Sequence, residues 1–176
     1  MAQLIFLHGA SSSGKSTLAR ALQARLPTPF LHLSIDHLRD SGALPLQRYA
    51  NGEFDWAESR EAFFAGFRAA VAAFADAGND MVLEHILERE QWLDDLRRKL
   101  ASHDVFFVAL HCPPELLAQR ESQRGDRPAG SALRDFQTIH KDRRYDLELD
   151  SRDGVDANCE TLLAAWRSGV RRSDFT

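Results

Sequence analysis

Short apolar runs alternate along the chain with longer segments in which apolar residues recur at helical spacing. Strands that alternate with helices are typical of a parallel sheet covered by helices. The last apolar run alternates apolar and acidic residues, so we expect it at an edge of the sheet. The pattern predicts an α/β protein with a five-stranded parallel sheet and helices on both faces. The predicted strands are Leu4–Leu7, Phe30–Ile35, Met81–Leu83, Val105–Leu110 and Tyr145–Leu149.

Apolar residues three and four positions apart mark the predicted helices between these strands. Such spacing places side chains on one face of a helix, and we interpret the first two stripes as faces that pack into the core. The stripes are Leu18, Leu22 and Leu26; Phe63, Phe67, Val71 and Phe74; Trp92, Leu93, Leu96 and Leu100; Leu133, Phe136 and Ile139; and Leu162, Leu163, Trp166 and Val170.

Two segments fall outside the alternation. Residues Arg39–Asp55 are rich in turn-forming residues and predict an irregular insertion after the second strand. Residues Arg124–Gly130 combine charge, glycine and proline. Loops of this length in a compact domain are usually functional. We therefore expect one domain over residues 1–176, with a substrate-side insertion at about 39–55 and a lid at about 120–130.

Composition narrows the classes of partner. The 176 residues carry a net charge of −4, which gives no basic field for duplex nucleic acid. No apolar run approaches the roughly 20 residues needed to span a bilayer, and Met1–Leu7 leads straight into a strand. We expect a cytoplasmic protein that binds neither nucleic acid nor membrane. Cys112 and Cys159 lack metal-type spacing and are predicted to be buried free thiols.

The strongest motif follows the first strand. Residues Gly9–Ser16 match G-x-x-x-x-G-K-[ST] in full and precede a helix starting near Lys15. Small residues let the backbone wrap around a phosphate, while successive N–H groups face its oxygens. Lys15 would contact the β- and γ-phosphates, and Ser16 would bind magnesium. The predicted ATP-binding residues are Gly9, Ala10, Ser11, Ser12, Ser13, Gly14, Lys15, Ser16 and Thr17.

Acidic residues follow the second and third strands, at the edge where parallel sheets bind ligands. Asp36 is the candidate general base, because phosphoryl transfer needs a carboxylate to orient the accepting hydroxyl and take its proton. The alternative is that Asp36 caps the following helix. Glu84 could hold a magnesium-bound water or bind substrate. His85 could contact substrate, or act as a structural hydrogen-bonding residue.

A basic segment follows the fourth strand. Between Arg120 and Arg144 there are seven basic and four acidic residues. This composition suits a lid that closes over phosphates, with Arg124 and Arg127 as the candidates that stabilise the transferred group. Arg120, one helical turn earlier, could stack on adenine. The alternative is an ordinary solvated helix end.

These residues resemble those of the chloramphenicol phosphotransferase-like family. The resemblance is carried by Gly9–Ser16, Ile35–Asp36, Arg124–Gly130, His140 and Tyr145–Asp150. It implies a P-loop kinase fold of the nucleoside-monophosphate-kinase type with strand order 2-3-1-4-5. It also implies ATP as donor, a hydroxyl of an antibiotic or similar metabolite as acceptor, and Asp36 as base. The family's third strand usually ends in two aspartates, whereas this chain has Glu84-His85.

Three functions are consistent with these features. The first is an ATP- and magnesium-dependent O-phosphotransferase acting on a small molecule. The second is a kinase of a nucleotide or sugar acid, for which the insertion offers only Arg39 and Arg48 as basic residues. The third is a nucleotide-dependent binding module or switch. The chain has no guanine-reading Asn-Lys-x-Asp segment, which argues against a GTPase-like switch. The sequence favours the first.

Overall fold

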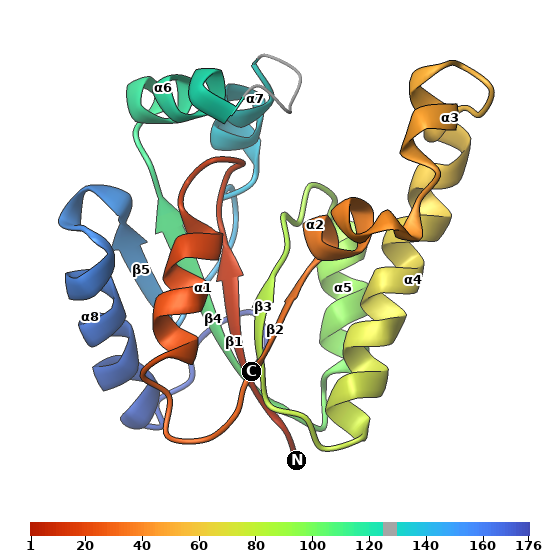
Figure 1. The fold of residues 1–176 in the computed structure, drawn as a ribbon. Coiled ribbons are helices and arrows are strands. Elements are labelled where there is room, and N and C mark those ends of the chain that lie inside the picture. Colours follow the sequence, from red (N-terminus) through yellow and green to blue (C-terminus); the bar gives the residue numbers. More distant parts are fainter. Residues whose placement is uncertain (125–129) are drawn as a thin grey trace.

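Parallel strands and helices alternate along the chain in the computed structural model, which describes residues 1–124 and 130–176 (Figure 1). The side chains of Arg124 and Ser131 lie outside this description. The elements are β1 (Gln3–His8), α1 (Lys15–Gln23), β2 (Leu31–Ser34), α2 (Ile35–Leu38), η1 (Arg39–Ala43), α3 (Leu46–Ala50), α4 (Trp56–Asp76), β3 (Met81–Glu84), α5 (Glu90–Lys99), β4 (Asp104–His111), α6 (Pro114–Arg124), α7 (Ser131–Thr138), β5 (Leu147–Asp150), η2 (Ser151–Asp153) and α8 (Val155–Arg167).

The five strands form one sheet in the order β2-β3-β1-β4-β5, and every neighbouring pair is parallel. In the central strand β1, Phe6 lies opposite Leu83 on one side and Phe107 on the other. A strand that is covered on both faces must be apolar throughout, which explains the unbroken run Leu4–Leu7. All five predicted strands, their order and the edge position of the last one are confirmed.

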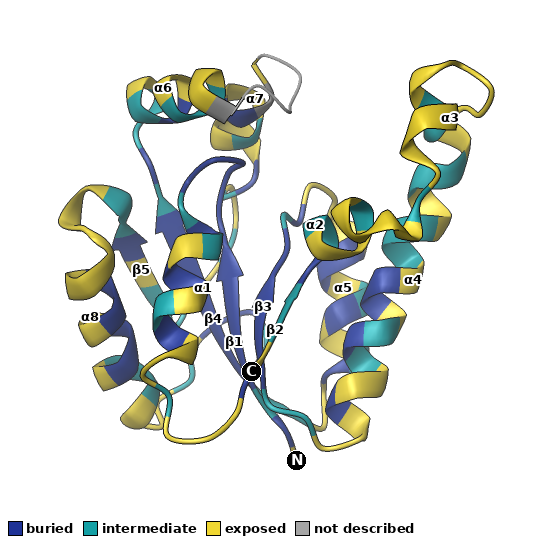
Figure 2. Ribbon diagram, viewed as in Figure 1, coloured by how far each residue is buried: buried dark blue, intermediate teal, exposed yellow. Residues whose placement is uncertain are grey.

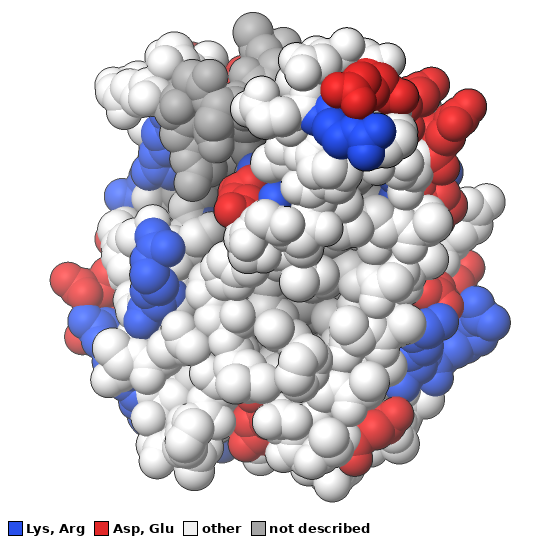
Figure 3. Space-filling model, turned by 45° about the vertical axis from the view of Figure 1, so that its right-hand side comes forward, with Lys and Arg blue, Asp and Glu red and all other residues white. Residues whose placement is uncertain are grey.

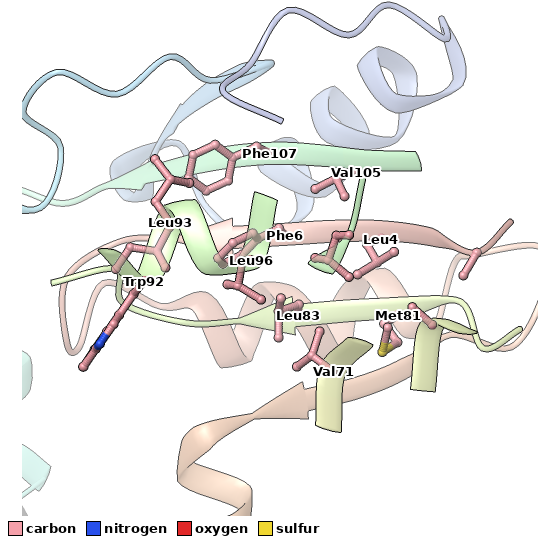
Figure 4. Close-up of a cluster of buried hydrophobic side chains, with 14 of the residues drawn as sticks. Leu4, Phe6, Val71, Met81, Leu83, Trp92, Leu93, Leu96, Val105 and Phe107 are labelled. Carbon is pink, nitrogen blue, oxygen red and sulfur yellow. The ribbon is translucent and has the colours of Figure 1, made fainter. Parts of the chain in front are cut away.

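Two hydrophobic cores lie on opposite faces of the sheet, because successive strand residues point to opposite sides. Leu4 and Phe6 face α4 and α5, where they pack with Val71, Trp92 and Leu96, as Figure 4 shows for this cluster. The alternate residues of β1 face α1 and α8. There they pack with Leu18, Leu22, Cys159 and Leu162. Each fully buried large side chain contributes roughly 1.5–3 kcal/mol, so the two cores fix the strand ends that carry the polar residues.

Some apolar residues of the predicted helix stripes do not pack in the two cores. Phe74 in the last turn of α4 is 42% exposed, Leu133 and Phe136 on α7 are 47% and 39% exposed, and Val170 beyond α8 is 47% exposed. The interpretation of Phe74 as a core residue is therefore wrong. Helix α7 instead packs through Ala132 and Ile139 in a third, small cluster with Ala10, Cys112 and Leu117.

The segment 39–55, called the arm below, is more regular than its composition predicts. It contains the π-type turn η1 and the short helix α3, so the expectation of an irregular insertion is wrong in part. Gly42 has a φ of 88° and breaks η1. Figures 1 and 2 show α3 and the start of α4 standing away from the sheet, with mostly exposed residues. The arm thus reaches out beside the carboxyl ends of the strands.

Both cysteines are free and buried, as predicted. Among the described residues, every helix is too short or too polar to cross a membrane.

Candidate active site

The loop between β1 and α1 has the path that a phosphate-binding loop requires. Ser12 and Gly14 adopt positive φ values of 65° and 105°. A Cβ on Gly9 would lie 2.6 Å from the carbonyl oxygen of Leu110, which is closer than real contacts allow. The predicted helix begins at Lys15, with Gly14 as its N-cap. Glycine is therefore needed at position 9 for space and at position 14 for backbone conformation.

Several side-chain hydroxyl groups of this loop are buried and have no hydrogen-bond partner among the described residues, so a ligand could supply one. The hydroxyl oxygens of Ser11, Ser12 and Ser13 are buried, and none has a hydrogen-bond partner among the described residues. Lys15 is also buried, and its Nζ donates to the carbonyl oxygens of Gly9 and Ala10, both at 2.8 Å. Buried hydroxyls usually have partners. Phosphate oxygens can accept from all three, so the residues fit the phosphates of a nucleotide.

Ser16 links the phosphate loop to the end of β3. Its hydroxyl donates to Oε2 of Glu84 at 2.9 Å, while the other carboxylate oxygen, Oε1, contacts Nε2 of His32 on β2. Three elements thus meet next to the loop: α1 provides the hydroxyl, β3 the carboxylate, and β2 the histidine that orients it. Hard divalent cations prefer oxygen ligands, so Ser16 and Glu84 fit a metal bound beside the phosphates.

Glu84 is ionised although it is buried. Burial by itself raises the pKa of a carboxyl group, but the hydrogen bond from His32 and the positive charge of Lys15 outweigh it. The pKa of Glu84 consequently lies below its usual value. A buried carboxylate with this environment carries the negative charge that attracts a cation or a cation-bound water.

Asp36 lies in the first turn of α2, directly after β2. Its backbone N–H donates to Oγ of Ser34 at 3.2 Å, so Ser34 is the cap of this helix. The alternative interpretation of Asp36 as the helix cap is therefore wrong. Arg39 lies one turn later and forms an ion pair with the Asp36 carboxylate at 3.2 Å. That pair fixes the carboxylate at the mouth of the site.

His85 is held among aromatic rings. The ring centroids of Phe64 and Trp92 lie 5.6 and 5.5 Å away at shallow angles, and Phe67 approaches edge-on. Neither ring nitrogen has a hydrogen-bond partner in the described part of the chain, so a structural hydrogen-bonding role is not seen. Burial, reinforced by the charge of Arg68, lowers the pKa of His85 to about 3. His85 is neutral at physiological pH.

The predicted lid is partly described. Arg120 on α6 lies against the phosphate loop and donates from Nη1 to the carbonyl oxygen of Ser13 at 3.0 Å. Arg124 ends α6 with its side chain outside the described residues, and Arg127 lies outside them altogether. Glu121 joins α6 to α7, because its carboxylate accepts the backbone N–H groups of Gly130 and Ala132.

One cavity of about 390 Å³ brings most of the predicted residues together. Residues 11–17 of the phosphate loop and the start of α1 line it. Asp36, Glu84 and His85 border one end, and Arg120 borders the other together with residues of the loop before α8. The cavity therefore brings phosphate-binding groups and the carboxylate of Asp36 to one space.

Several lining residues escaped the sequence reasoning. Phe64 borders the acceptor end, and Gly154 and Val155 border the Arg120 end. Arg39, predicted only as a basic residue of the insertion, also borders the acceptor end. His32, which contacts Glu84, was interpreted only as part of a strand. No motif marks these positions. Asp36 and Glu84 were found because they directly follow apolar runs, whereas the others come together only through the fold.

Solved structures with the same fold include several kinases. The APS kinase of Mycobacterium tuberculosis has a TM-score of 0.70 at 17% identity, and the alignment covers 94% of this chain and 98% of that one. Shikimate kinase of Aquifex aeolicus has a TM-score of 0.62 at 17% identity, covering 94% and 97%. At these identities the likeness establishes the P-loop kinase fold.

Comparison with known sequences identifies the family in addition to the fold. Two relatives from strains of Mycobacterium tuberculosis, MT2714 and Rv2636, whose names give O-phosphotransferase as a provisional activity, are each 29% identical over 169 residues. The alignment covers 85% of this chain and 75% of each relative. The family model described as chloramphenicol phosphotransferase-like protein matches residues 2–167. With its phosphate loop and kinase fold, the chain is a P-loop phosphotransferase that belongs to the chloramphenicol phosphotransferase-like family.

Proposed function

We propose that this protein transfers the γ-phosphate of ATP to a hydroxyl group of a small molecule, with magnesium as the metal. The observation that carries the proposal is the shared cavity, which phosphate-loop residues and the carboxylate of Asp36 border together. A donor site and a general base that face one space can act on two substrates held side by side. The family membership supports the same reaction class.

The nucleotide would lie along the phosphate loop. Lys15 and the hydroxyls of Ser11, Ser12 and Ser13 would bind the β- and γ-phosphates, and Arg120 would lie against adenine. Ser16 and Glu84 would hold magnesium, which neutralises charge on the phosphates when bound. The APS kinase with this fold was solved with AMPPNP, an ATP analogue, which supports a nucleotide at this end.

Asp36 would act as the general base. It accepts the proton of the acceptor hydroxyl as that oxygen bonds to the γ-phosphorus and the bond to the bridging β–γ oxygen breaks, which releases ADP. Arg39 keeps the Asp36 carboxylate in place through its 3.2 Å ion pair. Arg124 and Arg127 would stabilise the charge of the transferred group, a role inferred from the sequence alone.

The acceptor is an antibiotic or a related hydroxylated metabolite in this proposal. Phosphorylated or carboxylated acceptors need cations at the acceptor end. There, Arg39 pairs with Asp36 and Asp40, and Arg48 on the arm pairs with Glu53 at 2.9 Å. Figure 3 shows basic and acidic side chains next to each other on this side of the molecule. Neighbouring carboxylates weaken the attraction for an anion, which favours an uncharged acceptor over nucleotides and sugar acids.

The test is a mass-spectrometric screen. Purified protein is incubated with magnesium and ATP and with a mixed panel of hydroxylated antibiotics, nucleosides, sugars and sugar acids, and the Asp36→Asn variant is run in parallel. We expect one panel compound to gain a single phosphate with the wild type and not with the variant. Phosphorylation that persists in Asp36→Asn removes Asp36 as the base. Turnover of only sugar acids or nucleotides would replace the antibiotic-like acceptor with the alternative.

A further inference from the structure

Three side chains behind the active site form a continuous hydrogen-bonded chain. The backbone N–H of Leu87 donates to Nε2 of His8 at 3.1 Å. Nδ1 of His8 lies 2.9 Å from the hydroxyl oxygen of Tyr145, and that oxygen lies 2.8 Å from Nδ1 of His140. His8 is fully buried, and Tyr145 and His140 are half-buried. The proposed reaction uses none of these groups.

The backbone N–H of Leu87, the first donor, determines the direction of every hydrogen bond in this chain. A backbone amide can only donate, so Nε2 of His8 accepts and carries no hydrogen. Burial, with the neighbouring charges, keeps the pKa of His8 well below its usual value, so its single proton is on Nδ1 and is donated to Tyr145. The hydroxyl of Tyr145 then donates its own hydrogen to Nδ1 of His140. His140 is left with its proton on Nε2, and burial lowers its pKa to about 4.

The chain joins three segments, of which the loop after β3 and the phosphate loop border the cavity. Leu87 lies between the cavity-lining residues Ile86 and Glu88, in the loop of residues 85–89 between β3 and α5, called the acceptor-side loop below. His8 directly precedes Gly9, whose carbonyl oxygen accepts from Lys15. His140 follows α7.

Helix α7 contacts the phosphate loop a second time. The carboxylate of Asp135 accepts the backbone N–H of Ser11 at 3.0 Å. Ala132 and Ile139 pack in the small cluster that includes Ala10. Helix α7, which follows the predicted lid, is therefore attached to the phosphate loop on either side of Ala10. Asp135 makes the contact at Ser11, and the hydrogen bonds from His140 through Tyr145 make the contact at His8.

We propose that His8, Tyr145 and His140 are positioning residues that hold the phosphate loop, the acceptor-side loop and the end of α7 in one fixed arrangement for phosphoryl transfer. The inference rests on the proposed function, because phosphoryl transfer is the reaction whose groups are held in place. Reacting groups displaced by about 1 Å can lose roughly 10²-fold in rate, and the carbonyl oxygens that hold Lys15 start one residue after His8.

Tyr145→Phe tests this with the loss of one oxygen atom. Histidine tautomers are measured by long-range ¹H–¹⁵N NMR, magnesium-ATP affinity by calorimetry, and kcat and KM with the acceptor from the screen. In the wild type we expect His8 protonated on Nδ1 and His140 on Nε2. In Tyr145→Phe we expect His140 to lose its single tautomer, and kcat and ATP affinity each to fall about tenfold in protein that remains folded. Tyr49→Phe, at the only other tyrosine of the chain, should leave both histidine signals unchanged.

Two His140 variants separate positioning from a merely structural role. In His140→Asn the new side-chain oxygen can lie near the former Nδ1 and accept from Tyr145, so kcat should stay near the wild-type value. His140→Phe removes the acceptor and should resemble Tyr145→Phe. A lower melting temperature with unchanged kcat and ATP affinity overturns the proposal, as does a wild-type His8 protonated on Nε2. If no acceptor is phosphorylated while the tautomers and the loss of ATP affinity are as expected, the proposed function fails but the positioning of the nucleotide site stands.

Discussion

The phosphate loop and the arm both contribute residues to the lining of the cavity, and they are built in different ways. Residues 9–13 and Lys15 are buried. No residue between Arg39 and Asp55 is buried. The loop is fixed by backbone conformation and by contacts with β4, α6 and α7, whereas the arm is held by a few aromatic contacts and ion pairs. Such a division allows one rigid donor site to be combined with an acceptor surface that can vary without loss of the fold.

The largest effect should separate chemistry from nucleotide binding. Asp36→Asn keeps the shape of the side chain but removes its basicity, and we expect kcat to fall by about 10²–10⁴-fold. ATP affinity, measured by calorimetry, should stay within about twofold of the wild-type value because Asp36 lies on α2 and outside the phosphate loop.

Lys15→Ala is the counterpart on the loop side. We expect it to weaken ATP binding, because the buried ammonium group faces the phosphate site. An equal loss of ATP affinity in the two variants would show that the donor and acceptor sides are not separate in function.

His85 lines the cavity that the two regions share, and it makes stability depend on pH. Its folded-state pKa of about 3 lies below the unfolded value near 6.5, so the unfolded chain binds a proton first as pH falls. The contribution is complete above about pH 6.5 and is lost progressively below it. Between about pH 6.5 and 4.5 the loss amounts to about 2–3 kcal/mol from this residue.

Urea unfolding from about pH 7 to 4.5 measures this dependence. His85→Phe, which keeps a ring beside Phe64 and Trp92, should reduce the slope of unfolding free energy against pH by about one proton. His37→Gln replaces an exposed histidine and serves as the control. A slope that changes equally in both variants would assign the effect to general titration and not to burial of His85.

Gly9→Ala tests the rigidity of the phosphate loop directly. The added methyl group meets the carbonyl oxygen of Leu110 and the hydroxyl of Ser13, and overpacking of this kind costs about 1–3 kcal/mol. Gly66→Ala is the matched control, because Gly66 lies inside α4 with nothing within 4 Å of the new atom. There the same change should stabilise the protein by about 0.5–1 kcal/mol. Equal effects on thermal unfolding at both positions would contradict a tight loop.

The two regions also differ in how far the sequence predicts them. The phosphate loop was predictable because backbone approach to phosphate demands glycine at fixed positions, and the strands were predictable because full burial demands apolar runs. The arm was interpreted as irregular, since the helical turns η1 and α3 are too short for a periodic signal. Contacts such as His32 with Glu84, or His8 with Tyr145, join residues 52 and 137 positions apart. Only the folded sheet brings them together, and one sequence gives no sign of such pairs.

The smallest effect on stability is expected at the tip of the arm. Phe54 is 38% exposed, and the guanidinium group of Arg48 lies 4.0 Å above its ring. Phe54→Ala removes this contact, which is worth about 0.5–1 kcal/mol at an exposed site. Because much of the ring already faces solvent, the unfolding free energy should change by no more than about 1 kcal/mol. The acceptor KM should rise about 2–5-fold, because the arm continues from Asp36 beside the acceptor end of the cavity.

Phe74→Ala provides the control for that comparison. Phe74 is also exposed, at 42%, but it lies in the last turn of α4, at the opposite end of the helix from the arm. It should alter neither the acceptor KM nor ATP affinity. If Phe54→Ala instead reduced ATP affinity as strongly as it raised the acceptor KM, the arm would be coupled to the phosphate loop. Acceptor choice could then not vary independently of the donor site, and the fold would have one functional unit where we infer two.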